Sequence, residues 1–231
     1  MKIGIIGAMS EEIKELKSIM KNINEIIIGG LHFFEGDLHG KNVVLVECGI
    51  GKVNAAITAT LLINFFKISH IIFTGVAGSL NENIDIFDIV IGTELIETDF
   101  DVSGDGKALG VIPRMKESFF KPDKKLFDLA IESAINIFGK EKVISGRIST
   151  RDEFVTKEER VKFIRETFNA ECTEMEGAAV AHTCYIFNIP FVVIRSISDK
   201  SNSDSAISFE KFVSIAAKNS KLVVEEILKK I

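Results

Sequence analysis

The sequence is poor in the residues that build disulfide frameworks and metal sites. It has no tryptophan, one tyrosine, three prolines and three cysteines among 231 residues. The cysteines are odd in number and include no C-x-x-C pair, so reduced, mostly buried thiols are expected rather than disulfides or a zinc site. The four histidines show no H-E-x-x-H or similar ligand spacing. Neither a metal centre nor a disulfide core is therefore expected.

The sequence also has no excess of positive charge and no long apolar run. The formal net charge is -5, and no cluster of Lys and Arg is interleaved with aromatics, which argues against a nucleic acid partner. No apolar run approaches the ~18 residues of a membrane span. The apolar part of the opening stretch MKIGIIGAMSEE is short for a signal peptide and runs straight into carboxylates. A cytoplasmic protein with no membrane partner is expected.

Cofactor-binding motifs are absent as well. The glycines of GIIGAM, Gly4 and Gly7, do not complete the G-x-G-x-x-G fingerprint of dinucleotide-binding folds. No P-loop, kinase motif set or G-x-S-x-G elbow occurs. No organic cofactor is therefore expected.

The residues that are present predict an α/β fold. The chain is 46% hydrophobic and 26% charged, has no linker or internal repeat, and is expected to form a single domain over residues 1–231. Short β-branched runs alternate with amphipathic stretches, which predicts a central mixed twisted sheet flanked by helices. Strands are expected over 2–7, 31–40, 41–49, 70–78, 88–99, 142–150, 170–175 and 189–198. Helices are expected from Ser10, over 52–66, 123–138 and 157–168, from Gly177 and from Ser208, with a long loop over 100–122.

Polar or glycine-rich segments follow four of the expected strands. Ligands of such sheets bind beyond the carboxyl ends of the strands. That rule selects four segments as candidate binding residues: Gly75-Val76-Ala77-Gly78, Thr150 to Val155, Met175-Glu176 and Ser198-Asp199.

Three carboxylates lie at or near these positions, and each has a simpler explanation. Glu12 could favour the positive end of a helix, because it falls in the first turn after Ser10. Asp199 could be a turn or N-cap residue. Glu176 is harder to explain structurally, since its apolar neighbours leave few partners other than Arg195, and a buried carboxylate without a partner is costly. A ligand is the alternative partner.

Five segments in order resemble the 5′-methylthioadenosine/S-adenosylhomocysteine nucleosidases of the purine nucleoside phosphorylase superfamily. They span essentially the whole chain and read MKIGIIGAMSEE, GIGKVNAA, TGVAGSL, EMEGAAVAH and VIRSISDKS followed by SF. The resemblance implies a nucleoside phosphorylase-like fold and hydrolysis of the bond between adenine and the ribose of a 5′-thio-substituted adenosine. It further implies a small-molecule nucleoside substrate, no metal or cofactor, a homodimer and a role in methionine salvage.

The same resemblance implies a role for each carboxylate. The transition state resembles a ribosyl oxocarbenium ion, so the site must stabilise positive charge, hold a water and protonate the base. Asp199 would protonate adenine N7, Glu12 would bind the water with Arg195 nearby, and Glu176 would accept hydrogen bonds from the ribose hydroxyls. The substrate-binding residues would be Val76, Ala77, Gly78 and Ser198 at strand ends, Phe154 and Val155 at adenine, Ile50, Met175 and Phe209 at the sugar and 5′-thio side, and Val102 and Pro113 in the long loop.

Some positions depart from the pattern typical of the family. Val76 stands where a Ser is typical, which leaves one hydroxyl fewer near the sugar. Thr98-Asp99-Phe100-Asp101 stands where His-Asp-x-Asp is frequent, and Asp105 stands where an aromatic is common. None of these changes removes one of the three carboxylates.

Three other functions remain open at this point. A phosphorylase of the same superfamily would use phosphate, which prefers cations to the Ser10-Glu11-Glu12 segment. A futalosine hydrolase would differ in the 5′ pocket. A nucleoside-binding module without turnover would have no need of the proton donor Asp199.

Overall fold

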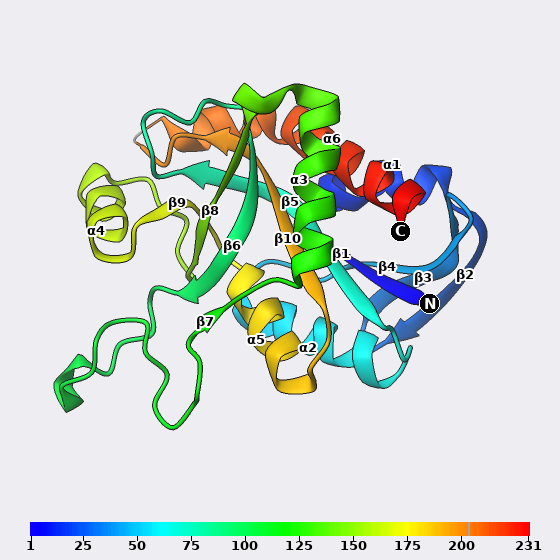
Figure 1. The fold of residues 1–231 in the computed structure, drawn as a ribbon, viewed down its shortest axis with the longest axis horizontal. Coiled ribbons are helices and arrows are strands. Elements are labelled where there is room, and N and C mark those ends of the chain that lie inside the picture. The colour runs from blue at the N-terminus through cyan, green and yellow to red at the C-terminus, as the bar shows by residue number, and fades with distance from the viewer. Residues whose placement is uncertain (203) are drawn as a thin grey trace.

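One ten-stranded mixed sheet forms the centre of the molecule, with helices on both of its faces (Figure 1). The computed structural model describes residues 1–202 and 204–231. The strands are β1 (Lys2–Gly7), β2 (Lys21–Ile28), β3 (Leu31–Leu38), β4 (Lys41–Glu47), β5 (His70–Ser79), β6 (Ile89–Glu97), β7 (Phe119–Phe120), β8 (Val143–Thr150), β9 (Ala170–Glu174) and β10 (Phe191–Asp199). The helices are α1 (Ser10–Ile19), α2 (Lys52–Asn64), α3 (Lys124–Phe138), α4 (Glu158–Phe168), α5 (Gly177–Phe187) and α6 (Ser205–Lys230), with short 3₁₀ turns at Ser103–Asp105 and Lys140–Lys142.

Half of the sheet closes on itself around β10. This strand pairs with β5 in parallel and with β6 in antiparallel orientation, and β6, β8, β9 and β5 follow one another around the ring. Strand β7 pairs with β6, and the other four strands, in the order β1, β4, β3 and β2, form an arm that continues from β5. Because β5 belongs to both parts, its carboxyl end lies where the ring meets the arm. A strand-order change of this kind is where open α/β sheets bind ligands.

Two groups of helices cover the two faces of the sheet. Helices α1, α3 and α6 pack on one face and bury a cluster that includes Leu16, Ala130 and Val224. Helices α2 and α5 pack against each other on the opposite face, over a cluster that includes Ala59 and Val180. The small side chains along α5 allow its close approach to both α2 and the sheet. No described helix meets the length and hydropathy needed to span a membrane.

The structure confirms the predicted α/β architecture and corrects several boundaries. The hairpin around Gly40 forms as expected between β3 and β4. The final helix begins at Ser205 rather than at Ser208, and the segment 100–122 contains a 3₁₀ turn and the short strand β7 instead of loop alone. Strand β2 was not predicted. It is an edge strand with mostly exposed residues, including Ile27 at 61% exposure, and therefore lacks the alternation of a half-buried strand.

Candidate active site

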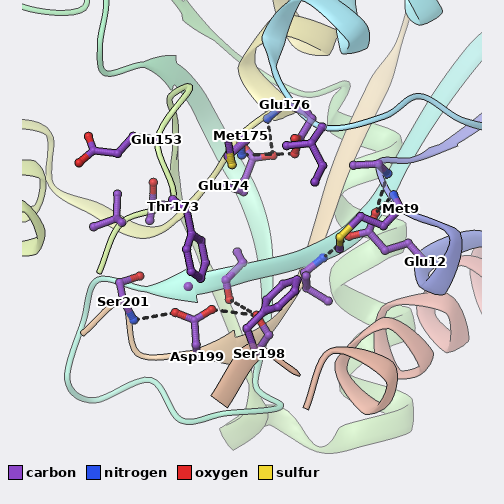
Figure 2. Close-up of a pocket in the computed structure, with 18 residues that line it drawn as sticks. Met9, Glu12, Glu153, Thr173, Glu174, Met175, Glu176, Ser198, Asp199 and Ser201 are labelled. Carbon is purple, nitrogen blue, oxygen red and sulfur yellow. Dashed lines mark hydrogen bonds between the residues drawn. The ribbon is translucent and has the colours of Figure 1, made fainter. Parts of the chain in front are cut away.

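A cavity of about 390 Å³ opens at the carboxyl ends of β5, β9 and β10, beside the first turn of α1. Its lining is mainly apolar, with Glu12, Glu176 and Asp199 on three sides of the same space (Figure 2). The remaining lining residues are Ala8, Met9, Ile50, Val76, Ala77, Gly78, Glu153, Phe154, Val155, Thr173, Glu174, Met175, Ser198, Ser201 and Phe209. Residues from each of the four segments selected by the strand-end rule therefore line one cavity.

Glu12 is held rigidly by backbone donors at the floor of the cavity. Its Oε2 accepts hydrogen bonds from the N–H groups of Ala8, at 2.5 Å, and Met9, at 3.0 Å, and its Oε1 accepts one from Val76 N–H at 2.9 Å. Gly75 makes this approach possible, because a Cβ at that position would lie 2.5 Å from Glu12 Oε1. Glu12 therefore caps α1, as its position in the sequence suggested, and also faces the cavity.

Arg195 supplies the positive charge behind the cavity. Its guanidinium is 1% exposed and donates to Glu174 Oε2 at 2.6 Å, a different partner from the Glu176 considered above. Burial raises the pKa of Glu12, against the Arg195 charge and the three backbone N–H groups, which lower it. Arg195 does not line the cavity. It acts on the site through its charge and through Glu174.

Glu176 lies at the junction of β9 and α5 and is 6% exposed. Its Oε1 accepts a hydrogen bond from Gly51 N–H at 2.8 Å, and its Oε2 accepts a longer one from Met175 N–H at 3.3 Å. Burial, together with the nearby charge of Glu174, raises the pKa of Glu176. No cation forms an ion pair with Glu176 among the described residues. This carboxyl group therefore has capacity left for a ligand that donates hydrogen bonds.

Asp199 ends β10 and is 1% exposed. Its Oδ1 accepts a hydrogen bond from Ser201 N–H at 2.8 Å and its Oδ2 accepts one from Ser198 Oγ at 3.0 Å. Burial raises the pKa of Asp199 although these donors lower it. Lys200, the nearest cation in sequence, points away and contacts Asp85 Oδ1 at 3.2 Å. The raised pKa favours a protonated Asp199, the form that a general acid needs.

Aromatic and thioether side chains complete the wall. The rings of Phe154 and Phe209 meet edge to face at a centroid distance of 5.8 Å, and Phe154 remains 46% exposed at the mouth of the cavity. Met9 and Met175 add polarizable sulfur atoms to the lining. The segment that carries Phe154 is anchored through Asp152, whose Oδ1 accepts from Lys52 N–H at 2.9 Å. A flat apolar group with a thioether substituent suits such a lining.

Of the site residues that the family resemblance implied, three lie outside this lining, as do Gly75 and residues 150–152 of the selected strand-end segments. Arg195 stands behind the cavity, whereas Val102 and Pro113 belong to the long segment between β6 and β7, which extends away from the sheet (Figure 1). The lining residues that the sequence did not indicate are Ala8, Met9, Thr173, Glu174 and Ser201. Thr173, Glu174 and Ser201 lie within two residues of a selected strand end, so a slightly wider selection would have found them. Ala8 and Met9 follow β1, whose carboxyl end was not selected.

Residues suited to a metal ion do not gather in the part of the chain that the structure describes. No group of three or more His, Cys, Asp or Glu has the required arrangement there. All three cysteines are free and buried. Burial raises the pKa of each thiol, which leaves it protonated and unreactive.

Comparisons with known proteins agree with this geometry. The family model for the phosphorylase superfamily matches residues 2–229. The 5′-methylthioadenosine/S-adenosylhomocysteine nucleosidase of Listeria innocua is 43% identical over 100% of both chains, and that of Psychromonas ingrahamii is 42% identical over 99% of this chain and 98% of its own. The corresponding enzyme of Neisseria meningitidis, solved with methylthio-immucillin-A, superposes with a TM-score of 0.96 at 39% identity and covers 100% of this chain and 99% of its own. A futalosine hydrolase of Helicobacter pylori superposes with a TM-score of 0.95 at 35% identity, covering 100% and 98%.

Proposed function

Because the chain belongs to the 5′-methylthioadenosine/S-adenosylhomocysteine nucleosidase family of the phosphorylase superfamily, we propose that it hydrolyses the N-glycosidic bond of 5′-thio-substituted adenosines. The products would be adenine and the corresponding 5-thioribose. The observation that carries the proposal is the convergence of Glu12, Glu176 and Asp199 on one cavity lined by apolar and thioether groups. Hydrolysis at this cavity would serve methionine salvage.

Each carboxylate has one task in the proposed reaction. Water held by Glu12 attacks C1′ of the ribose and gives a proton to the Glu12 carboxylate, the bond from C1′ to N9 of adenine breaks, and the Asp199 proton goes to N7 of the departing base. Glu176 accepts hydrogen bonds from the ribose hydroxyls. The positive charge that develops on the sugar lowers the pKa of Glu176, so that its negative charge appears where the transition state needs it. Arg195 balances the charge of Glu174 beside this group.

The charge of the cavity lining favours water over phosphate as the attacking group. Five acidic residues line the cavity, and no Lys, Arg or His does so among the residues that the structure describes. A phosphate dianion needs cationic or N–H donors, and the Val76, Ala8 and Met9 N–H groups are already bonded to Glu12. Phosphate beside Glu12 would also be repelled by the carboxylate. Hydrolysis is therefore favoured over phosphorolysis.

Purified protein is expected to release adenine from 5′-methylthioadenosine in phosphate-free buffer, as measured by chromatography. Added phosphate should leave both the rate and the sugar product unchanged. Release that depends on phosphate would identify a phosphorylase, whereas tight binding without any release would identify a binding module. Rates for 5′-methylthioadenosine, S-adenosylhomocysteine and an aminofutalosine, compared in the same assay, measure the preference for the 5′ substituent. The apolar groups of Met9, Met175 and Ile50 favour the thioethers.

We also infer a homodimer that forms through α2 and α5. These packed helices expose Val53 at 70%, Ile57 at 50% and Ile186 at 63%, and solvated apolar residues gathered in this way mark interaction sites. In sedimentation velocity, V53E/I57E is expected to shift the protein from twice its 25.5 kDa chain mass to one chain mass. Ile27→Glu, at an exposed residue of the edge strand β2, is the matched control and should remain dimeric. A wild-type protein that sediments as a monomer would refute this assembly.

The three thiols bear on the location of the enzyme. Cys48, Cys172 and Cys184 are all free. Because reduced cysteines are typical of reducing compartments, we infer that the enzyme works in the cytoplasm.

A further inference from the structure

Ser201 presents a buried hydroxyl to the cavity that the proposed mechanism does not use. It follows β10 closely, lines the cavity next to Asp199 and is 1% exposed (Figure 2). Its Oγ has no hydrogen-bond partner within residues 1–202 and 204–231. A buried polar group left without a partner destabilises the folded protein. A ligand group that hydrogen bonds this hydroxyl would remove that cost.

The position of Gly78 shows that the Ser201 hydroxyl and the Asp199 carboxylate face the same point. A Cβ added to Gly78 would lie 2.2 Å from Ser201 Oγ and 2.8 Å from Asp199 Oδ1. Gly78 itself lines the cavity and leaves that point open. Both polar groups therefore border one small space at the carboxyl end of β5.

The backbone of Ser201 supports a role for its side chain. Its φ is +52°, in the left-handed region where glycine is the favoured residue and other residues are uncommon. The conformation lets Ser201 N–H donate to Asp199 Oδ1 at 2.8 Å, which a glycine would do equally well. The backbone thus gives no reason for a side chain at this position, whereas a hydroxyl that contacts the ligand does.

We propose that Ser201 Oγ accepts a hydrogen bond from the 6-amino group of adenine while Asp199 protonates N7. On the purine ring, N7 and the 6-amino group are neighbours on the same edge, one an acceptor and the other a donor. Two protein groups that border one space, a protonated carboxyl and a hydroxyl, match that pair. The assignment rests on the proposed nucleosidase function and extends it to recognition of the base. Ser201 is in this sense a specificity-determining residue for 6-aminopurines over purines without a 6-substituent.

The test removes each partner of this contact separately. Ser201→Gly deletes the hydroxyl and suits the left-handed backbone, so the variant is expected to fold. The substrates are 5′-methylthioadenosine and its analogue with hydrogen in place of the 6-amino group. A 6-oxo analogue is unsuitable because the hydroxyl could donate to the oxygen. We expect kcat/KM for the 6-amino substrate to fall about three- to tenfold, as for one neutral hydrogen bond, and kcat/KM for the analogue to stay unchanged.

The controls separate base recognition from a structural effect. Ser201→Ala removes the same hydroxyl without adding the flexibility of glycine and should give the same selective loss. Ser79→Ala, at a buried serine of β5 whose Oγ donates to the Asn81 carbonyl at 2.7 Å, should change neither substrate selectively. An equal loss for both substrates, or no loss for either, would overturn the proposal while leaving the nucleosidase function intact. Failure of the wild-type protein to release adenine would overturn both.

Discussion

Asp199→Asn is expected to lower kcat for 5′-methylthioadenosine by ~10²–10⁴-fold, the usual contribution of a general acid. The amide has the size of the carboxyl group and still accepts the Ser201 N–H bond, but its N–H group is far too weak an acid to transfer a proton to N7. Adenine would then have to leave as an anion. Binding of the nucleoside should be retained, because Glu176 and the apolar wall are unchanged. Adenine release by chromatography and nucleoside binding by calorimetry measure the two effects separately.

The pH profile checks the same assignment independently. Burial raises the pKa of Asp199, and only the protonated form is active, so activity is present at low pH and is lost as pH rises through that pKa. The alkaline decline of kcat/KM in the wild-type protein should therefore be absent from the residual activity of the Asn variant.

Asp204→Asn is the matched control for this substitution. Asp204 lies nearby, at the exposed start of α6, and does not line the cavity. The activity and the pH profile of the Asp204→Asn variant should equal those of the wild-type protein. If Asp199→Asn turned over at the wild-type rate, another group would have to be the acid.

Much of this fold could be predicted because local patterns and global topology agree. Each of the buried strands β1, β5 and β10 contains a short apolar run, and Ser10 and the acids after it indicate the start of α1. The closure of the ring through β10 could not be predicted, since pairing between β10, β5 and β6 depends on contacts far apart in the chain. The edge strand β2 was not predicted for a different reason: it buries too few side chains to show the alternation of a half-buried strand.

Some features of the candidate site could likewise be predicted from the sequence, and others could not. The strand-end residues of the candidate site could be selected from the sequence because the ends of neighbouring parallel strands meet at one edge. The partner of Arg195 could not be predicted. Glu174 and Glu176 are close in sequence, and the geometry of the strand alone decides which of them faces the guanidinium. Glu174 follows the alternation of β9 toward Arg195, whereas Glu176 lies beyond the strand at the start of α5. The ion pair therefore leaves Glu176 for the ligand.

Because Glu174 pairs with Arg195 and Glu176 is left for the ligand, Glu176→Gln is expected to lower activity but to raise stability at high pH. Loss of the charge opposite the cationic sugar should lower kcat by about 10²-fold or more. The free energy of unfolding of the variant, measured relative to that of the wild-type protein, should rise with pH. Burial and the Glu174 charge raise the pKa of Glu176 from 4.5 to about 8 in the folded protein. Between these values the folded state binds more protons than the unfolded state, so the wild-type stability falls as pH rises by up to ~1.4 kcal/mol per pH unit.

The glutamine variant has no proton to lose, so its free energy of unfolding should lack this decline. Chemical denaturation from pH 5 to pH 9 should therefore show a difference, variant minus wild type, that is smallest near pH 5, grows toward pH 8 and then levels off. Any fixed cost of placing an amide near the Met175 N–H shifts the whole curve without changing its slope. Glu117→Gln, at an exposed residue, controls for the loss of one negative charge. A difference that does not vary with pH would show that Glu176 stays ionised in the free enzyme, and that the ligand is not needed to stabilise its charge.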